Sequence, residues 1–351
     1  MAEQAQAECT PSPQQLNVDP EWIEPDDNDS SVGTETASST TSISESILEY
    51  RKLHGRTYQN FNTGTEYWGP NDDRQNDGLD LSHHMLYLAL DNKLFLAPIG
   101  DNPQRVIDVG TGTGIWAIDF ADQFPSAEVI GTDLSPIQPP WVPPNCKFEL
   151  DDAQLPWPYP DNHFDYVHIR VLMGAIKDWP ALYKEIYRCL KPGGWFEHMD
   201  YSIDVRSDDN SIPEDSPLNG WGNLFQKAGE RMGRSFRIIE DGQSLQWLKD
   251  TGFTTVNEHR FKLPTGGWAA DKKWKEIGQY NLLITENSLE GYVLFLLTQV
   301  MGWEVSEVQV FLAKTRKALR DKSIHSYAEV ATVWGQKPLN EKKEAVPTTE
   351  A

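Results

Sequence analysis

Three glycines spaced by single residues stand between an apolar strand and a helix, near the first third of the chain. They are Gly110, Gly112 and Gly114. The preceding stretch Arg105–Val109 predicts a buried strand, and a helix is expected over 114–123. Glycine lets the backbone turn sharply and lets a ligand approach it closely. The spacing differs from the dinucleotide fingerprint, whose third glycine would fall at Ile115, and no Gly-Lys-Ser/Thr of a Walker loop follows.

Acidic residues accompany the ends of three predicted strands. Asp108 lies two residues before the first glycine, Asp133 follows a strand over 127–132, and Asp152 follows a strand over 146–150. Asp108 would repel a phosphate but suits an ammonium group. Asp133 can accept both hydroxyls of a ribose, and Asp152 can accept the amine of adenine. Together they fit S-adenosylmethionine, although each acid taken alone also suits a helix cap or a solvated turn.

Candidates for acid–base chemistry follow the fourth and fifth predicted strands, over 164–169 and 194–205. Methyl transfer to oxygen or nitrogen is an in-line displacement that needs positioning, exclusion of water and in some enzymes a base. The candidates are His168, Arg170 and His198. His198 would suit a base, although a packed or solvated histidine is the commoner role. Arg170 would suit an acidic acceptor group, and a structural salt bridge is the alternative.

No metal site is predicted. The three cysteines, at 9, 146 and 189, lie far apart and form no CxxC pair. His83 and His84 are adjacent, so on a helix their side chains point about 100° apart and cannot bind one ion together. A position on a helix surface is the default expectation for both.

The charge of the chain excludes several classes of partner. Its 351 residues include 31 Lys and Arg against 53 Asp and Glu, which gives a net charge of −22. Residues 1–50 contribute eleven acidic side chains and no Lys or Arg. Nucleic acids and anionic membranes attract basic surfaces, so neither is expected to bind directly. No apolar run approaches the ~20 residues of a membrane span, and no signal peptide is apparent, so we expect a cytoplasmic protein.

Alternating strands and helices after residue 100 predict an α/β fold with a mostly parallel sheet. The acidic, Ser/Thr-rich residues 1–42 predict a disordered leader, and residues 339–351 predict a flexible tail. A single domain is expected between them, over residues 43–338. Its expected parts are N-terminal cap helices over 43–100, with one helix beginning at 43 and running to about 59, a cofactor-binding core over 104–205, and a helical insertion over 268–320 with helices at 272–285, 289–301 and 306–319.

The acceptor pocket is expected where these added segments meet the sheet. The core strands provide no deep pocket of their own, so residues 56–68 and the helices over 272–319 must cover the carboxyl edge and exclude water. Both segments are rich in aromatic side chains, which would line the pocket or pack the cap against the core. These side chains are Tyr58, Phe61, Tyr67, Trp68, Trp274, Tyr280, Tyr292 and Phe295.

The motifs together resemble those of the class I, Rossmann-like S-adenosylmethionine-dependent methyltransferases. The match runs from about residue 104 to 200 and includes Asp108-Val-Gly-Thr-Gly-Thr-Gly, Asp152-Ala-Gln-Leu-Pro and Leu190-Lys-Pro-Gly-Gly-Trp. The resemblance implies a seven-stranded, mostly parallel sheet whose last strand is antiparallel, with the helical insertion before that strand. It also implies which residues bind the cofactor: Asp108, Gly110, Gly112, Thr113, Gly114, Asp133, Leu134, Asp152 and Ala153.

A narrower resemblance, over residues 50–337, is to the fungal LaeA-like methyltransferases of secondary metabolism. It rests on stretches such as Tyr67-Trp-Gly-Pro-Asn-Asp and Ser135-Pro-Ile-Gln-Pro-Pro. The family implies an enzyme that methylates oxygen or nitrogen of a small-molecule or peptide-derived natural product. The alternative is a nuclear regulator of secondary-metabolite gene clusters that acts through protein partners. Thr111, where that regulator carries Cys, and the absence of its His-, Ser- and Arg-rich tail favour the enzyme; a protein methyltransferase is a third, weaker class.

Overall fold

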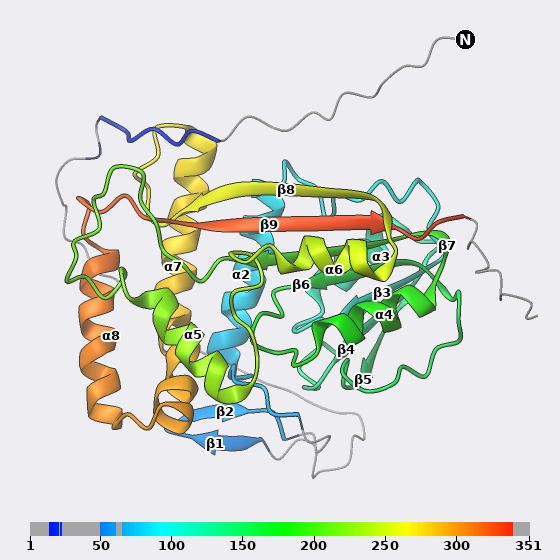
Figure 1. The fold of residues 1–351 in the computed structure, drawn as a ribbon, viewed down its shortest axis with the longest axis horizontal. Coiled ribbons are helices and arrows are strands. Elements are labelled where there is room, and N and C mark those ends of the chain that lie inside the picture. Colours follow the sequence, from blue (N-terminus) through cyan, green and yellow to red (C-terminus); the bar gives the residue numbers. More distant parts are fainter. Residues whose placement is uncertain (1–13, 21, 23–49, 61–64, 340–351) are drawn as a thin grey trace, which may run out of the picture.

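A central sheet with helices on both faces forms the body of the molecule (Figure 1). The computed structural model describes residues 14–20, 22, 50–60 and 65–339. The strands are β1 (Arg51–Leu53), β2 (Arg56–Tyr58), β3 (Arg105–Val109), β4 (Glu128–Asp133), β5 (Cys146–Leu150), β6 (Phe164–Arg170), β7 (Leu190–Tyr201), β8 (Thr254–Pro264) and β9 (Tyr327–Gln336). The helices are α2 (Asp73–Ala89), α3 (Ile115–Gln123), α4 (Trp179–Cys189), α5 (Trp221–Met232), α6 (Gln243–Thr251), α7 (Lys272–Phe295) and α8 (Val305–Leu319).

The main sheet has seven strands in the order β5-β4-β3-β6-β7-β9-β8. Strands β3 to β7 pair in parallel, whereas β9 runs antiparallel to both of its neighbours, β7 and β8. The predicted seven-stranded, mostly parallel sheet with an antiparallel last strand is therefore confirmed. The carboxyl ends of β3 to β7 meet along one edge, which is where ligands bind in open sheets of this kind.

Successive side chains of a strand point to opposite faces of the sheet, so the core has one part on each face. Val106 of β3 packs with the α3 residues Trp116 and Phe120 on one face. Ile107, the next residue of β3, packs with residues of α4 and α6 on the other face. Helices α5, α7 and α8 lie beyond the carboxyl edge, and α2 runs alongside α7 (Figure 1). The added helices therefore cover the edge at which a ligand would bind.

Helices α2 and α7 approach each other closely through small residues. A Cβ atom on Gly78 of α2 would lie 2.5 Å from Ser288 Oγ, and one on Gly291 of α7 would lie 2.4 Å from Gln75 Oε1. A larger residue at either position would require Ser288 or Gln75 to move, so the two glycines allow α2 and α7 to approach closely.

The expected helix over 43–59 is wrong in the residues that the structure describes. Residues 50–60 include the antiparallel hairpin of β1 and β2. His54 and Gly55 between these strands have φ angles of 49° and 84°. Two successive left-handed residues form the turn that matches the twist of a hairpin, and they end a helix. Residues 43–49 lie outside the described residues.

The insertion contains two long helices where three were expected. Helix α7 continues without a break through the residues between 285 and 289, because no proline or positive-φ glycine interrupts it there. It ends in a π-helical turn over Leu296–Val300, and Gly302, with φ of 76°, leads into α8. The insertion itself, between β8 and β9, has the expected place in the chain.

Part of the segment expected to be a disordered leader lies against the domain. Val18 forms an antiparallel bridge with Ala269, and the Asp19 backbone N–H donates to the Trp268 carbonyl at 2.7 Å. The Asp19 carboxylate forms an ion pair with Lys275. The expectation is therefore wrong for residues 14–20 and 22, and the rest of 1–42 and the tail from 340 lie outside the described residues.

Candidate functional site

The glycine loop between β3 and α3 has a backbone that other residues would strain. Gly110, Gly112 and Gly114 have φ angles of 69°, 60° and 83°, all in the left-handed region. A Cβ atom at position 110 would lie 2.5 Å from Leu172 Cδ2, and one at position 114 would lie 2.2 Å from Phe148 Cζ. The loop thus leaves its backbone open to a ligand on one side while it packs tightly on the other.

The Asp108 carboxylate is buried at the base of this loop and is held by two side chains. Its Oδ2 accepts from the Thr111 hydroxyl at 2.6 Å, and its Oδ1 lies 2.7 Å from Nδ1 of His168. Asp108 and His168 face each other in the register of β3 and β6. Burial lowers the pKa of His168, so a neutral imidazole donates its Nδ1 hydrogen to Asp108. The ring also stacks on Trp116 with centroids 3.7 Å apart.

Asp133 joins the end of β4 to the glycine loop. Its Oδ2 accepts from the Gly112 backbone N–H at 2.8 Å, and its Oδ1 accepts from the Ser135 backbone N–H at 2.9 Å. Burial raises the pKa of Asp133 to about 6, and these two hydrogen bonds oppose the rise. Each carboxylate oxygen has a second lone pair, so the group can still accept hydroxyl hydrogens from a ligand.

Asp152 lies in the turn after β5, with 2% of its surface exposed. Its Oδ1 accepts from the Gln154 backbone N–H at 3.0 Å. The Gln154 side chain in turn donates to the Thr65 hydroxyl at 3.2 Å, which connects this turn to the segment before α2.

One cavity of about 320 Å³ contacts all three carboxylates and most of the predicted cofactor residues. The predicted residues that line it are Asp108, Gly110, Gly112, Thr113, Asp133, Leu134, Asp152 and Ala153. Gly114 is not among them; it supports the loop from behind, against Phe148. The structure therefore brings side chains from the ends of β3, β4 and β5 to a single open space.

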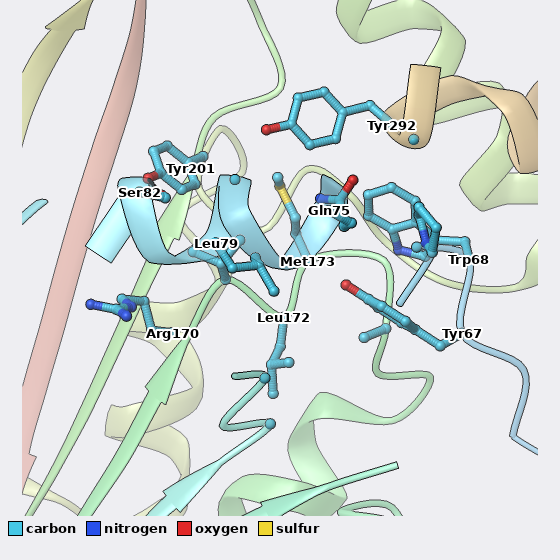
Figure 2. A pocket seen from close by; sticks show the side chains of 18 of the residues that line it. Tyr67, Trp68, Gln75, Leu79, Ser82, Arg170, Leu172, Met173, Tyr201 and Tyr292 are labelled. Carbon is cyan, nitrogen blue, oxygen red and sulfur yellow. Dashed lines mark hydrogen bonds between the residues drawn. The ribbon is translucent and has the colours of Figure 1, made fainter. Parts of the chain in front are cut away.

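The cavity continues past the glycine loop into a chamber walled by α2, α7 and the segment before α2 (Figure 2). Of the aromatic residues expected in an acceptor pocket, Tyr67, Trp68 and Tyr292 line it. Phe61 lies outside the described residues. The others pack elsewhere in the core or cap: Tyr58, Trp274, Tyr280 and Phe295. Sequence reasoning missed the contribution of α2, because its Gln75, Leu79 and Ser82 reach the chamber only through the fold.

The three candidates for acid–base chemistry lie in different places. His168 is beneath the loop and contacts Asp108, whereas His198 is 1% exposed and lies outside the residues that line the cavity. Its Nδ1 lies 2.7 Å from the Tyr183 hydroxyl, and its ring stacks on Trp179 at 4.7 Å. His198 is therefore a packed core histidine. Of the three candidates, only Arg170 lines the cavity.

His83 differs from the expected surface position. It is buried on the inner face of α2, with Nε2 at 2.9 Å from Asp119 Oδ2 and Nδ1 at 3.1 Å from Arg170 Nη2. His84 contacts Tyr280 edge-on. Within the described ranges, no group of three or more His, Cys, Asp or Glu side chains is arranged to hold a metal ion.

The site fits the chemistry of S-adenosylmethionine. A Cβ atom at position 112 would meet only Leu79 Cδ1, at an ordinary contact distance of 3.4 Å, so the backbone of the loop faces open space there. The carboxylates at the ends of neighbouring strands can accept hydrogens from an ammonium, a ribose and an adenine amine, in that order along the sheet. A phosphate-bearing cofactor would meet the same carboxylates with unfavourable charge.

Comparisons with known proteins agree with this geometry. A family model described as a methyltransferase domain matches residues 81–258. Methyltransferase pytC of Aspergillus terreus is 37% identical over 87% of this chain and 93% of its own length. The secondary metabolism regulator LAE1 of Cochliobolus heterostrophus is 36% identical over 81% of this chain and 94% of its own. The protein-methionine methyltransferase laeA of Emericella nidulans is 33% identical over 83% and 77%, respectively.

The chain belongs to the class I S-adenosylmethionine-dependent methyltransferases, within the fungal LaeA-like family of secondary metabolism. It is an enzyme of that class, and S-adenosylmethionine is its cofactor. Among the residues placed by the structure, no helix is long and apolar enough to cross a membrane.

Proposed function

We propose that this enzyme methylates an oxygen or nitrogen atom of a small-molecule or peptide-derived natural product. The observation that carries the proposal is the single cavity that joins the glycine loop and its carboxylates to an aromatic-walled chamber. A chamber enclosed by α2, α7 and the segment before α2 suits a compact acceptor, since such sites bury most of a small ligand.

The cofactor-binding roles follow from the position of each group along the sheet. Asp133 would accept the ribose hydroxyls, and Asp152 with Ala153 and Leu134 would hold the adenine at the ends of β4 and β5. Asp108, oriented by His168, supports the glycine loop at the amino-acid end. S-adenosylmethionine, when bound, supplies a methyl group on a positively charged sulfur. The chain positions the acceptor in line with that group and excludes water from it.

The chamber offers little for acid–base catalysis. Away from the carboxylates near the cofactor, the titratable groups among its described lining residues are Tyr67, Tyr201, Tyr292 and Arg170. Burial raises the pKa of each tyrosine, so all three are neutral phenols at pH 7. Catalysis therefore rests on positioning and desolvation of the acceptor. The nucleophilic atom of the acceptor is already deprotonated or carries a free lone pair.

The test is a methyl-transfer assay on an extract. Purified protein and S-adenosylmethionine with a labelled methyl group are incubated with an organic extract of a producing fungus from which the gene is deleted. The proposal expects one labelled small molecule, absent when a variant with Asp133→Ala and Asp152→Ala replaces the wild-type protein. Label found only on protein would contradict the small-molecule acceptor.

The second candidate is a regulator of secondary-metabolite gene clusters that acts through a protein partner. The relatives named as secondary metabolism regulators, at 33–36% identity, favour it. Gene deletion separates the two. The enzyme, placed in the cytoplasm, predicts loss of one methyl group and accumulation of the unmethylated compound. The regulator, placed in the nucleus, predicts lowered transcripts from several clusters.

A further inference from the structure

One end of the chamber has a polar character that the aromatic wall lacks. Arg170 at the end of β6, Ser82 of α2 and Tyr201 at the end of β7 all line the cavity there. Figure 2 shows these three side chains on one side of the cavity, with Tyr67 and Trp68 on the other. We propose that they form an anion subsite that binds a carboxylate group of a ligand. This inference rests on the proposed function.

Arg170 is a cation without a paired carboxylate. Its Nη2 donates to His83 Nδ1 at 3.1 Å, and no carboxylate of the described residues forms an ion pair with it. Arg170 is partly buried in the wall of the cavity, and a guanidinium held there without a paired carboxylate favours the binding of an anion. The structural salt bridge that the sequence left open is therefore not formed within the described residues, and a ligand anion would supply the missing charge.

The two acids whose charges act on Arg170 are already engaged. Asp108 accepts from Thr111 and His168, as described above. Asp119 accepts from His83 Nε2 at 2.9 Å. Burial lowers the pKa of His83, so its neutral ring donates from Nε2 and accepts from Arg170 at Nδ1. The imidazole thus orients the guanidinium without neutralising it.

Hydroxyl groups complete the subsite. Ser82 Oγ and the Tyr201 hydroxyl lie 3.0 Å apart, so one donates to the other and one hydrogen remains for a ligand. Tyr201 lies close enough to Arg170 for the guanidinium charge to oppose the rise in the pKa of its hydroxyl that burial causes. A planar guanidinium with a neighbouring hydroxyl matches the two oxygens of a carboxylate.

Two ligands could bring this carboxylate. One is the amino-acid end of the cofactor, because Arg170 interacts electrostatically with Asp108 beneath the glycine loop. The other is an acidic group on an apolar acceptor, whose body would contact Leu79 and Met173 on the adjoining wall. The chemistry of recognition is the same, and pairs of ligands that differ only in the carboxylate distinguish them.

The experiment measures ligand affinity by calorimetry for the wild-type full chain, Arg170→Gln and Arg170→Lys. S-adenosylhomocysteine is compared with 5′-methylthioadenosine, which lacks the amino-acid carboxylate. With S-adenosylhomocysteine bound, 2-naphthoate is compared with its neutral amide, 2-naphthamide. Tyr201→Phe, which keeps the ring and removes the hydroxyl, provides a second variant should Arg170→Gln fail to fold.

The subsite predicts that Arg170→Gln weakens the carboxylate-bearing member of one pair by at least about tenfold, leaves its neutral counterpart unchanged, and is partly rescued by Lys. Tyr201→Phe should weaken the same ligand by a smaller factor. The affected pair identifies the source of the carboxylate. Unchanged affinity of the folded Arg170→Gln protein for both carboxylate ligands overturns the subsite. If Arg170→Gln does not fold, unchanged affinity of Tyr201→Phe for both ligands overturns it instead. Failure of wild-type protein to bind either nucleoside would instead overturn the proposed function.

Discussion

Two tyrosines near the start of the domain provide a matched test of which aromatic residues face the acceptor. Tyr67 lines the chamber, and Figure 2 shows its hydroxyl directed toward the wall formed by Leu172 and Met173. Tyr58 is 0% exposed and packs against Phe295 with ring centroids 5.7 Å apart. Each change to Phe removes one hydroxyl and keeps the ring, so the two variants differ only in where that hydroxyl lies.

The structure gives opposite expectations for the two changes. The Tyr58 hydroxyl is buried and has no hydrogen-bond partner in the described part of the chain, and burial raises its pKa to about 12. Tyr58→Phe removes this unpaired group and should stabilise the fold by about 1 kcal/mol, with methyl transfer unchanged. Tyr67→Phe should leave the free energy of unfolding within about 0.5 kcal/mol of wild type. It should lower kcat/KM by about 2- to 10-fold, the value of one neutral hydrogen bond.

Chemical denaturation measures the first quantity, and methyl transfer to the acceptor found in the extract assay measures the second. The reasoning is refuted if Tyr67→Phe has full activity, or if its loss of activity is matched by an equal loss in Tyr58→Phe. In that case Tyr67 packs the cap against the core and the acceptor contacts another wall.

Three further predictions concern the fold. Burial raises the pKa of Glu197 to about 7, from 4.5 in the unfolded chain, so its contribution to stability is fully present below pH 4.5 and is lost as the pH rises to 7. Glu197→Gln should remove up to ~3 kcal/mol of this pH dependence in urea denaturation. Deletion of residues 1–22 should lower Tm by about 2–4 °C relative to deletion of residues 1–13, because it removes the contacts of Asp19; equal Tm values would show that these contacts add nothing. Gly114→Ala should cost more than about 1 kcal/mol, since its Cβ would lie 2.2 Å from Phe148, and an unchanged denaturation midpoint would contradict the strained geometry of the loop.

The core strands could be predicted from the sequence because their signals are local. Arg105–Val109 is a mostly apolar stretch, and Cys146–Leu150 alternates apolar with charged residues; both strands begin and end at the predicted residues. The shared position of the three acidic residues follows from these predicted strands, because parallel strands have their carboxyl ends at one edge of the sheet. The pairing of Asp108 with His168 also depends on that register, which a sequence pattern does not specify.

The predictions that were wrong or missing concern features that depend largely on contacts between distant segments. The hairpin of β1 and β2 is too short for its alternation to be distinguished from a helical pattern, and its turn residues His54 and Gly55 are the local signal that was overlooked. The role of α2 in the chamber arises from its packing on α7 through Gly78 and Gly291. The docking of Val18 on Ala269 involves residues 251 positions apart in a composition typical of disorder.

The central claim is that one cavity holds S-adenosylmethionine through carboxylates at the ends of neighbouring strands. Calorimetric titration with S-adenosylhomocysteine tests it on the wild-type protein and on the double variant Asp133→Ala with Asp152→Ala. Asp122→Ala, which removes an exposed acid of α3, is the control for loss of an acid outside the cavity. Each lost carboxylate should cost ~1–3 kcal/mol of binding free energy, so the double variant should bind at least about 30-fold more weakly, with the control unchanged. Wild-type affinity in the folded double variant would contradict the assignment of this cavity as the cofactor site.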